Sequence, residues 1–382
     1  MPPPKIPVDL IMARLAQEAG EARHRLEKAR DILMGPLETD IAATPYDVVY
    51  EEDRIKLKYY RPARGPQIKT PLLVVSALIH RETILDLQPG RSVVQNLLKE
   101  GLEVYLIDWG HPTRKDRWLT IDDHVNGYMD NVIDFIRRRH GLNQINLMGV
   151  CMGGNFSLMY GALHPEKIKN LITVVTPSNF DTDKGLLHLW MKEIDADRLV
   201  DAFGNLPGDL LNIGLLLLNP ARLMFDKYVG FLENMDNQEF VENFIRMEKW
   251  IFDTPAVPGE TFRQFIKDCY QRNLLIQSRM ELGGARVDLQ QITMPLLNVY
   301  ARYDHLVPPE ACDRLTQCVG SRDTEDLCLD TGHIGIYVSH KCQKELVPKI
   351  ARWLKEREGS KEAPAEKPAR KKAARKRKPA SK

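Results

Sequence analysis

Cys151 has the sequence surroundings of a nucleophile. It stands in the string GVCMG (149–153), which is the pattern of a nucleophile elbow with cysteine in place of the usual serine. The apolar run 145–150 predicts a buried strand before the turn, and residues 154–162 predict a helix after it. A strand, a sharp turn and a helix would lift the sulfur above the edge of a sheet. The two glycines would allow the close backbone packing that this turn requires.

A thiol nucleophile needs a base that removes its proton and a group that orients the base. Asp304 ends a predicted strand at 296–304, and His333 follows the last predicted strand, 326–330. Cysteine, aspartate and histidine thus follow the chain order of nucleophile, acid and base in α/β-hydrolase enzymes. The carboxyl ends of parallel strands also meet at one edge of a sheet. We therefore predict that His333 takes the thiol proton, while Asp304 fixes the tautomer of His333 and stabilises its imidazolium form.

Two backbone N–H groups are the expected donors to the oxyanion of a tetrahedral intermediate. One belongs to Met152, directly after the nucleophile, and the other to Ile79, in the loop after the apolar run 71–78. His305, beside Asp304, is interpreted either as an auxiliary catalytic base or as a histidine in a structural hydrogen bond. Surface or packing roles are assigned to His80, His111 and His124, and structural roles to Cys269, Cys312, Cys318, Cys328 and Cys342.

The sequence predicts no cofactor and no metal. No cluster of histidine, cysteine and carboxylate residues has the spacing of zinc ligands. Neither a phosphate-binding P-loop nor a GxGxxG string after a strand is present.

Eight segments have the pattern of β-strands, with helices expected between the later ones. The predicted strands are 47–51, 55–60, 71–78, 102–109, 145–150, 171–177, 296–304 and 326–330. Several of them are continuous apolar runs, which are typical of strands buried on both faces. This order predicts an α/β class protein of the α/β-hydrolase fold, with a mostly parallel eight-stranded sheet and an inserted helical cap.

The chain divides into five stretches. Residues 1–40 form an N-terminal helical segment, 41–180 and 285–358 the α/β-hydrolase core, 181–284 the cap and 359–382 a basic tail. The cap could instead be a small helical domain without catalytic consequence. The apolar stripe of the first helix (Ile11, Leu15, Ala19, Ala22, Leu26, Ala29 and Leu33) fits either packing against its own domain or docking to a partner subunit.

Composition indicates an ordinary soluble protein of a reducing cytoplasm. Apolar residues make up 43% and charged residues 28% of the chain, and no apolar stretch is long enough to span a bilayer. The N-terminus lacks the apolar segment of a secretory signal, and six dispersed cysteines do not form a disulfide scaffold. The net charge is +2, of which the tail 359–382 carries +8 and the rest −6. We expect this tail to be disordered and to serve either solubility or contact with a polyanion such as DNA.

Several strings beyond the elbow carry a family resemblance over residues 40–356. The chain resembles the catalytic subunit of class III polyhydroxyalkanoate synthases in LIDWG (106–110), GVCMGG (149–154), RMEKWIFD (246–253), GETFRQF (259–265), DHLVPP (304–309) and GHIGIY (332–337). The resemblance implies transfer of (R)-3-hydroxyacyl groups, chiefly short ones such as 3-hydroxybutyryl, from coenzyme A to a growing polyester. It also implies that Cys151, Asp304 and His333 are the catalytic set. A second synthase subunit, a homo-oligomer and association with cytoplasmic polyester granules are implied as well. The basic tail departs from the family pattern.

Two rival functions fit the same residues. One is a hydrolase of this fold that acts on a thioester, a lactone or a stored polyester. The other is a non-catalytic granule or nucleoid scaffold, against which the intact cysteine, aspartate and histidine argue. Cysteine suits the transferase, because its attack on an acyl-coenzyme A exchanges one thioester for another and preserves the activation of the acyl group.

Overall fold

An eight-stranded sheet forms the centre of the computed structural model, which describes residues 8–359 of the chain. Its spatial order is β1-β2-β6-β3-β7-β8-β11-β12. The pairs β1–β2 and β2–β6 are antiparallel and the other five pairs are parallel. The strands are β1 Asp47–Glu52, β2 Ile55–Tyr60, β3 Leu72–Val75, β6 Val104–Asp108, β7 Ile145–Val150, β8 Ile168–Val174, β11 Leu296–Ala301 and β12 Thr324–Leu329. The predicted mostly parallel sheet is confirmed.

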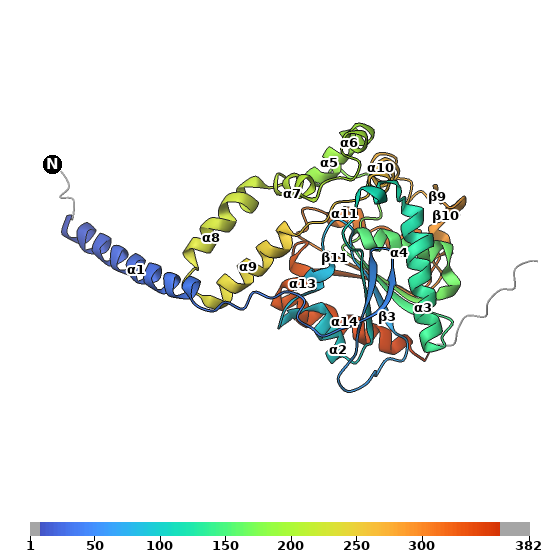
Figure 1. The fold of residues 1–382 in the computed structure, drawn as a ribbon, viewed down its shortest axis with the longest axis horizontal. Helices are drawn as coiled ribbons and strands as arrows, with labels where there is room; N and C mark the ends of the chain where they lie inside the picture. Colours follow the sequence, from blue (N-terminus) through green and yellow to red (C-terminus); the bar gives the residue numbers. More distant parts are fainter. Residues whose placement is uncertain (1–7, 360–382) are drawn as a thin grey trace, which may run out of the picture.

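Helices cover both faces of this sheet (Figure 1). Alternation along β3 shows why: Leu73 and Val75 join one apolar cluster with α3 Asp130–His140 and α4 Met152–Leu163. Leu72 and Val74 join the other cluster with α2 Val93–Lys99 and α14 His340–Arg357. Successive side chains of a strand point to opposite faces, so an uninterrupted apolar run requires cover on both sides.

Shorter elements connect these layers. Two small hairpins pair β4 Asp86–Gln88 with β5 Arg91–Ser92, and β9 Met280–Leu282 with β10 Ala285–Val287. Single turns and short helices are η1 Glu82–Leu85, η2 Arg114–Trp118, η3 Asp123–Met129, η4 Pro165–Lys167, η7 Leu289–Gln291, α11 Pro309–Cys312, α12 Leu315–Cys318 and α13 Gly335–Val338.

A buried ion network fastens the end of β6. Nζ of Lys58 lies 2.5 Å from Oε1 of Glu82 and 3.1 Å from Oδ2 of Asp108, and Arg81 reaches the same Asp108 oxygen at 3.4 Å. Burial alone would raise the pKa of Asp108, but Lys58 and Arg81 outweigh it and hold that pKa below its usual range. The aspartate of the LIDWG string therefore joins β2, β6 and η1.

Helices fill the chain between β8 and β11. They are α5 Leu186–Glu193, α6 Ala196–Phe203, α7 Gly208–Leu216, η5 Ala221–Asp226, α8 Lys227–Glu233, α9 Gln238–Phe252, α10 Gly259–Gln264 and η6 Phe265–Gln271. Figure 1 shows α5, α6 and α10 over one end of the sheet, and α8 and α9 side by side away from it. The latter pair is joined by the rings of Phe231 and Phe244, whose centroids are 4.4 Å apart, and by Lys227 and Glu248 at 2.8 Å.

The first helix, α1 Val8–Met34, runs outward from the body (Figure 1). Among its described side chains Ala29 is buried, whereas Leu26 is 61% and Leu33 43% exposed. The interpretation that the apolar stripe packs against its own domain is therefore wrong at Leu26 and Leu33. The prediction of a disordered basic tail at 359–382 concerns residues that, beyond Gly359, lie outside the described part of the chain. No helix within residues 8–359 is long and apolar enough to cross a membrane.

Candidate active site

Cys151 occupies the sharp turn between β7 and α4. Its backbone has φ 53° and ψ −122°, a conformation that non-glycine residues rarely adopt and that costs about 1–3 kcal/mol. Its N–H donates to the carbonyl oxygen of Val174 on β8 at 2.9 Å, and its own carbonyl accepts from Gly154 N–H at 2.9 Å. Strand and helix thus hold the strained residue from both sides, and the side chain stands where the helix begins.

Three glycines let the turn form. A Cβ on Gly153 would lie 2.5 Å from the carbonyl oxygen of Ser76 and would also collide with that of Val75. A Cβ on Gly154 would overlap the side chain of Thr176, and one on Gly149 would meet the backbone of Gly154. The first turn of α4 consequently lies directly against the loop that follows β3.

Asp304 and His333 form a buried pair. Nδ1 of His333 lies 2.6 Å from Oδ2 of Asp304, while Oδ1 accepts the N–H groups of Leu306 at 2.9 Å and Val307 at 2.8 Å. Burial alone would lower the pKa of His333. Asp304 and Cys151, through charge and hydrogen bonding, outweigh burial and raise that pKa to about 10. The carboxylate therefore orients the imidazole, and the imidazole shares one cavity with Cys151.

The two residues predicted to donate to an oxyanion, Met152 and Ile79, both have backbone N–H groups without an acceptor among the described residues. Met152 is the first residue of α4, and the first N–H groups of a helix have no acceptor within it. The N–H of Ile79 has no hydrogen-bond partner among the described residues, and the same holds for Ala77 two positions earlier. Ile79, Ala77 and Met152 all line the cavity that contains Cys151.

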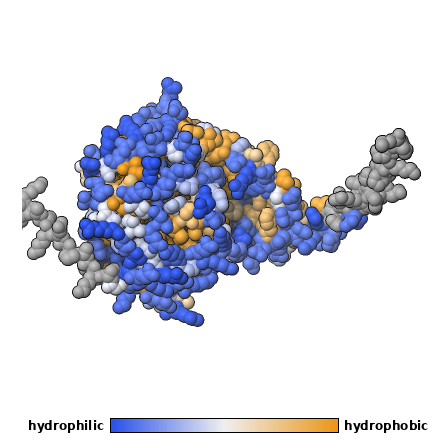
Figure 2. Space-filling view, turned by 180° about the vertical axis from the view of Figure 1, so that it is seen from behind, coloured by the Kyte–Doolittle hydropathy of each residue, from blue (hydrophilic) through white to orange (hydrophobic). Residues whose placement is uncertain are grey.

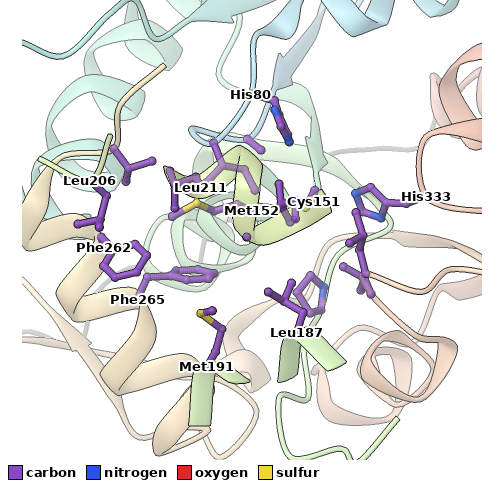
Figure 3. Close-up of a pocket in the computed structure, with 18 of the residues that line it drawn as sticks. His80, Cys151, Met152, Leu187, Met191, Leu206, Leu211, Phe262, Phe265 and His333 are labelled. Atoms are coloured by element: carbon purple, nitrogen blue, oxygen red, sulfur yellow. The ribbon is translucent and has the colours of Figure 1, made fainter. Parts of the chain in front are cut away.

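This cavity has a volume of about 840 Å³ and is lined mainly by apolar side chains. Cys151, His80 and His333 share it, and Figure 3 shows the two histidines on different sides of the cysteine. The segment between β8 and β11 provides much of the remaining wall, including Leu187, Met191, Leu206, Leu211, Phe262 and Phe265. The site is therefore a mostly apolar chamber with a few polar groups at one end.

Of the histidines His80 and His305, only His80 lines this cavity. His305 is not among its lining residues; its pKa is lowered, first by burial, although the charge of Asp304 acts in the opposite direction. His80, expected to be a surface or packing residue, does line the cavity. Burial, with a smaller effect of His333, lowers the pKa of His80 to about 4. No sequence signal marked His80, because the segment that covers it lies about 170 positions further along the chain.

Four of the other five cysteines have a raised pKa. All six thiols are free, and burial raises the pKa values of Cys269, Cys312, Cys318 and Cys328. Within residues 8–359, no group of three or more histidine, cysteine, aspartate or glutamate side chains could hold a metal ion.

The fold and this site define a protein of the α/β-hydrolase class with cysteine at the elbow. The family model described as alpha/beta hydrolase fold matches residues 70–339. Among solved structures, a monoacylglycerol lipase from Paleococcus ferrophilus is similar in fold, with a TM-score of 0.52 and 16% identity over 79% of this chain and 99% of that one. A putative non-heme bromoperoxidase, BpoC, from Mycobacterium tuberculosis has a TM-score of 0.51 and 14% identity over 81% of this chain and 99% of its own.

Sequence relatives narrow the class further. Residues 8–97 match the family described as Poly-beta-hydroxybutyrate polymerase (PhaC) N-terminus. The poly(3-hydroxyalkanoate) polymerase subunit PhaC of Allochromatium vinosum is 47% identical over 92% of this chain and 99% of its own length. The subunit of the same name from Synechocystis sp. is 46% identical over 85% of this chain and 89% of its own. The chain belongs to the poly(3-hydroxyalkanoate) polymerase family, whose members are acyltransferases, and the predicted resemblance is confirmed.

Proposed function

We propose that this protein polymerises (R)-3-hydroxyacyl groups from coenzyme A thioesters, chiefly short ones such as 3-hydroxybutyryl, through a thioester on Cys151. The observation that carries the proposal is one apolar cavity in which Cys151 stands beside the hydrogen-bonded pair of His333 and Asp304. The reaction needs no cofactor, because coenzyme A is part of the substrate and then a product.

Acylation begins when the sulfur of Cys151 attacks the thioester carbonyl. His333 takes up the thiol proton before the attack, as its raised pKa favours, and Asp304 stabilises the imidazolium. The N–H groups of Met152 and Ile79 donate to the oxyanion of the tetrahedral intermediate. When the carbon–sulfur bond to coenzyme A breaks, the leaving thiolate takes the proton from His333. The acyl group is left on Cys151, whose charge no longer raises the pKa of His333, and the neutral imidazole can serve as the base of the next step.

Elongation uses a hydroxyl group as the second nucleophile. Its oxygen attacks the carbonyl carbon of the Cys151 thioester, the oxoester forms and the thiolate leaves. Either His333 or Asp304 could take the proton of this hydroxyl. His333 is better placed, because both oxygens of Asp304 already accept hydrogen bonds from His333, Leu306 and Val307. The product oxoester is more stable than the thioester, so this step drives chain growth.

A dry chamber distinguishes such a transferase from a hydrolase. Water would compete with the hydroxyl for the acyl-enzyme, and the apolar walls from Leu187 to Phe265 would disfavour it. We assign this water-excluding role to the cap, 181–284.

Incubation with (R)-3-hydroxybutyryl-coenzyme A tests the proposal. A synthase releases coenzyme A and forms insoluble polyester, whereas a thioesterase or polyester hydrolase of the same fold releases only the free acid. A non-catalytic scaffold releases neither. The control is C151A, which keeps a small side chain at the elbow but lacks the sulfur; release that survives this change would remove Cys151 from the mechanism.

We also propose that α1 binds the second synthase subunit. Exposed apolar side chains of α1 support this proposal. The helices between β8 and α9 also have exposed apolar side chains, and Figure 2 shows apolar surface there. They are Leu26, Leu33 and Met34 on α1, and Ile213, Leu217, Phe225, Val229 and Leu232 on α7 to α8. Co-purification with the co-expressed subunit should be lost in L26E/L33E and kept in K28Q, a change at another exposed position of α1. Loss of a homo-oligomer instead would assign this surface to self-association.

Two further proposals concern location and the tail. The enzyme should sediment with polyester granules when its substrate is supplied.

The +8 tail, 359–382, should bind a polyanion. Deletion of these residues should then abolish salt-sensitive retention on DNA, and unchanged retention would remove that idea.

A further inference from the structure

His80 is fixed by the end of α9. Its ring lies on the ring of Trp250, with centroids 4.7 Å apart and an interplanar angle of 39°. Trp250 is itself anchored, because its Nε1 donates to the carbonyl oxygen of Arg81 at 2.9 Å. The loop after β3 and the C-terminal part of α9 thus hold the imidazole in one orientation at the wall of the cavity.

The hydrogen bonds of Thr254 assign the tautomer of this ring. The threonine hydroxyl has a single proton, and it donates to the carbonyl oxygen of Ile251 at 2.7 Å. Its oxygen therefore acts as acceptor toward Nδ1 of His80, 3.3 Å away. The proton of the neutral imidazole then resides on Nδ1, and Nε2 carries a lone pair.

Nε2 of His80 has no hydrogen-bond partner among the described residues, although the residue lines the same cavity as Cys151 and His333. The wall of this cavity also contains three buried polar atoms without a partner among the described residues: Ser76 Oγ, Asn155 Oδ1 and Tyr337 Oη. Buried polar groups are nearly always paired, so such a group in a cavity wall indicates a polar ligand. An uncharged acceptor in an apolar chamber matches a hydroxyl group.

The two histidines near Cys151 have opposite protonation tendencies. The pKa of His333 is raised to about 10, and that of His80 is lowered to about 4. Environments that shift the pKa values of two titratable groups in opposite directions suit the two groups to different roles. A ring with so low a pKa is a weak base, and it suits binding and orientation better than proton removal.

We infer that His80 forms a hydroxyl-binding subsite: its Nε2 accepts a hydrogen bond from the attacking 3-hydroxyl group and directs the oxygen at the thioester on Cys151. This assignment rests on the proposed function and adds the residue that positions the acyl acceptor. The proton itself still passes to His333. His80 acts in elongation and has no part in the first acylation, for which the hydroxyl is not needed.

The test separates these two steps. Rapid-quench assays with (R)-3-hydroxybutyryl-coenzyme A measure the first-turnover burst of coenzyme A, which reports acylation, and the later steady-state release, which reports elongation. In H80F the aromatic ring on Trp250 is kept and the acceptor is removed. We expect a burst like that of the wild type and steady-state release reduced by about 10-fold or more, the effect of losing one productive hydrogen bond. H80Q supplies an amide oxygen and should recover part of that loss.

A second substrate sharpens the readout. Butyryl-coenzyme A lacks the hydroxyl, so its burst should be equal in wild type and H80F. Steady-state release from 3-hydroxybutyryl-coenzyme A that is unchanged in H80F would overturn the subsite, and so would a burst that falls as far as elongation. Absence of any release in the wild type would instead contradict the proposed function.

Discussion

His333 lies 2.6 Å through Nδ1 from Oδ2 of Asp304, and the second oxygen of that carboxylate is held by the N–H groups of Leu306 and Val307. The carboxylate therefore cannot rotate away, and it fixes both the position and the tautomer of the imidazole. Nε2 of His333 is the nitrogen left for the thiol. The proposed mechanism needs this fixed geometry, because its base acts first on Cys151 and then on coenzyme A.

The substitution D304N should reduce coenzyme A release by about 10²- to 10⁴-fold. The amide can keep the shape of the side chain, but it lacks the charge that stabilises imidazolium and can favour the wrong tautomer. Initial rates with (R)-3-hydroxybutyryl-coenzyme A measure the effect. D330N is the matched control, because Asp330 follows the neighbouring strand β12 but pairs with Arg302 at the surface. Equal rates for both variants would contradict the role of Asp304.

Stability should depend on pH through His333. Its pKa is raised from an ordinary value of about 6.5 to about 10. Its stabilising contribution is therefore complete below about pH 6.5 and is lost as the pH rises through about 10. The difference in unfolding free energy between wild type and H333Q should be largest near pH 6 and smallest near pH 10, as measured by urea denaturation.

His124 supplies the control for that titration. Burial lowers its pKa to about 4, so the ring is neutral in both the folded and the unfolded chain above pH 7. The effect of H124Q on unfolding free energy should then be flat from pH 7 to pH 10. A flat profile for H333Q as well would show that His333 does not hold an extra proton in the folded state.

The elbow should tolerate no side chain at Gly153. In G153A the new methyl group would collide with backbone oxygens of Val75 and Ser76, so either the turn or the loop after β3 must move. We expect a destabilisation of several kcal/mol, about 2 or more, and loss of activity. G161A, in the same helix, would meet only Leu171 Cδ2 at 3.4 Å and should be neutral or stabilising by up to about 1 kcal/mol. Thermal unfolding of the two variants gives the comparison, and similar midpoints would contradict the steric argument.

Removal of a carboxylate from the buried ion network should be costly. D108A removes the carboxylate that pairs with both Lys58 and Arg81 in the interior. Breaking a buried ion pair typically lowers the unfolding free energy by about 3–5 kcal/mol. D183A breaks an exposed contact with Lys184 and should change stability by less than about 1 kcal/mol. Denaturant unfolding measures both variants; a small loss in D108A would mean that Glu82 alone neutralises the cluster.

The sheet could be predicted because its signals are local. Apolar runs such as 71–78 and 145–150 mark strands that are buried on both faces, and all eight predicted strands are present. Cys151 was predicted to be the nucleophile from its neighbours, and Asp304 and His333 to be its partners from their positions after strands; the structure brings His333 and Asp304 together. These features are fixed by residues close in the chain or by the rule that parallel strands end at one edge.

The place of His80 in the cavity and the exposure of α1 could not be predicted from neighbouring residues in the sequence. The environment of His80 depends on contacts with Trp250 and Thr254. These residues are distant in the sequence and reach His80 only when the cap has packed in place. Leu26 and Leu33 have the spacing of a packed helix, yet both side chains are exposed in the single chain. Periodicity reveals that an apolar stripe exists, but it does not reveal which surface covers it.

The thioester on Cys151 is the central claim, and mass spectrometry of the quenched enzyme tests it most directly. After brief incubation with (R)-3-hydroxybutyryl-coenzyme A, the peptide that contains Cys151 should carry a 3-hydroxybutyryl group that hydroxylamine removes, and C151A should carry none. Turnover with the acyl group on another residue, or undiminished coenzyme A release by C151A, would contradict the account.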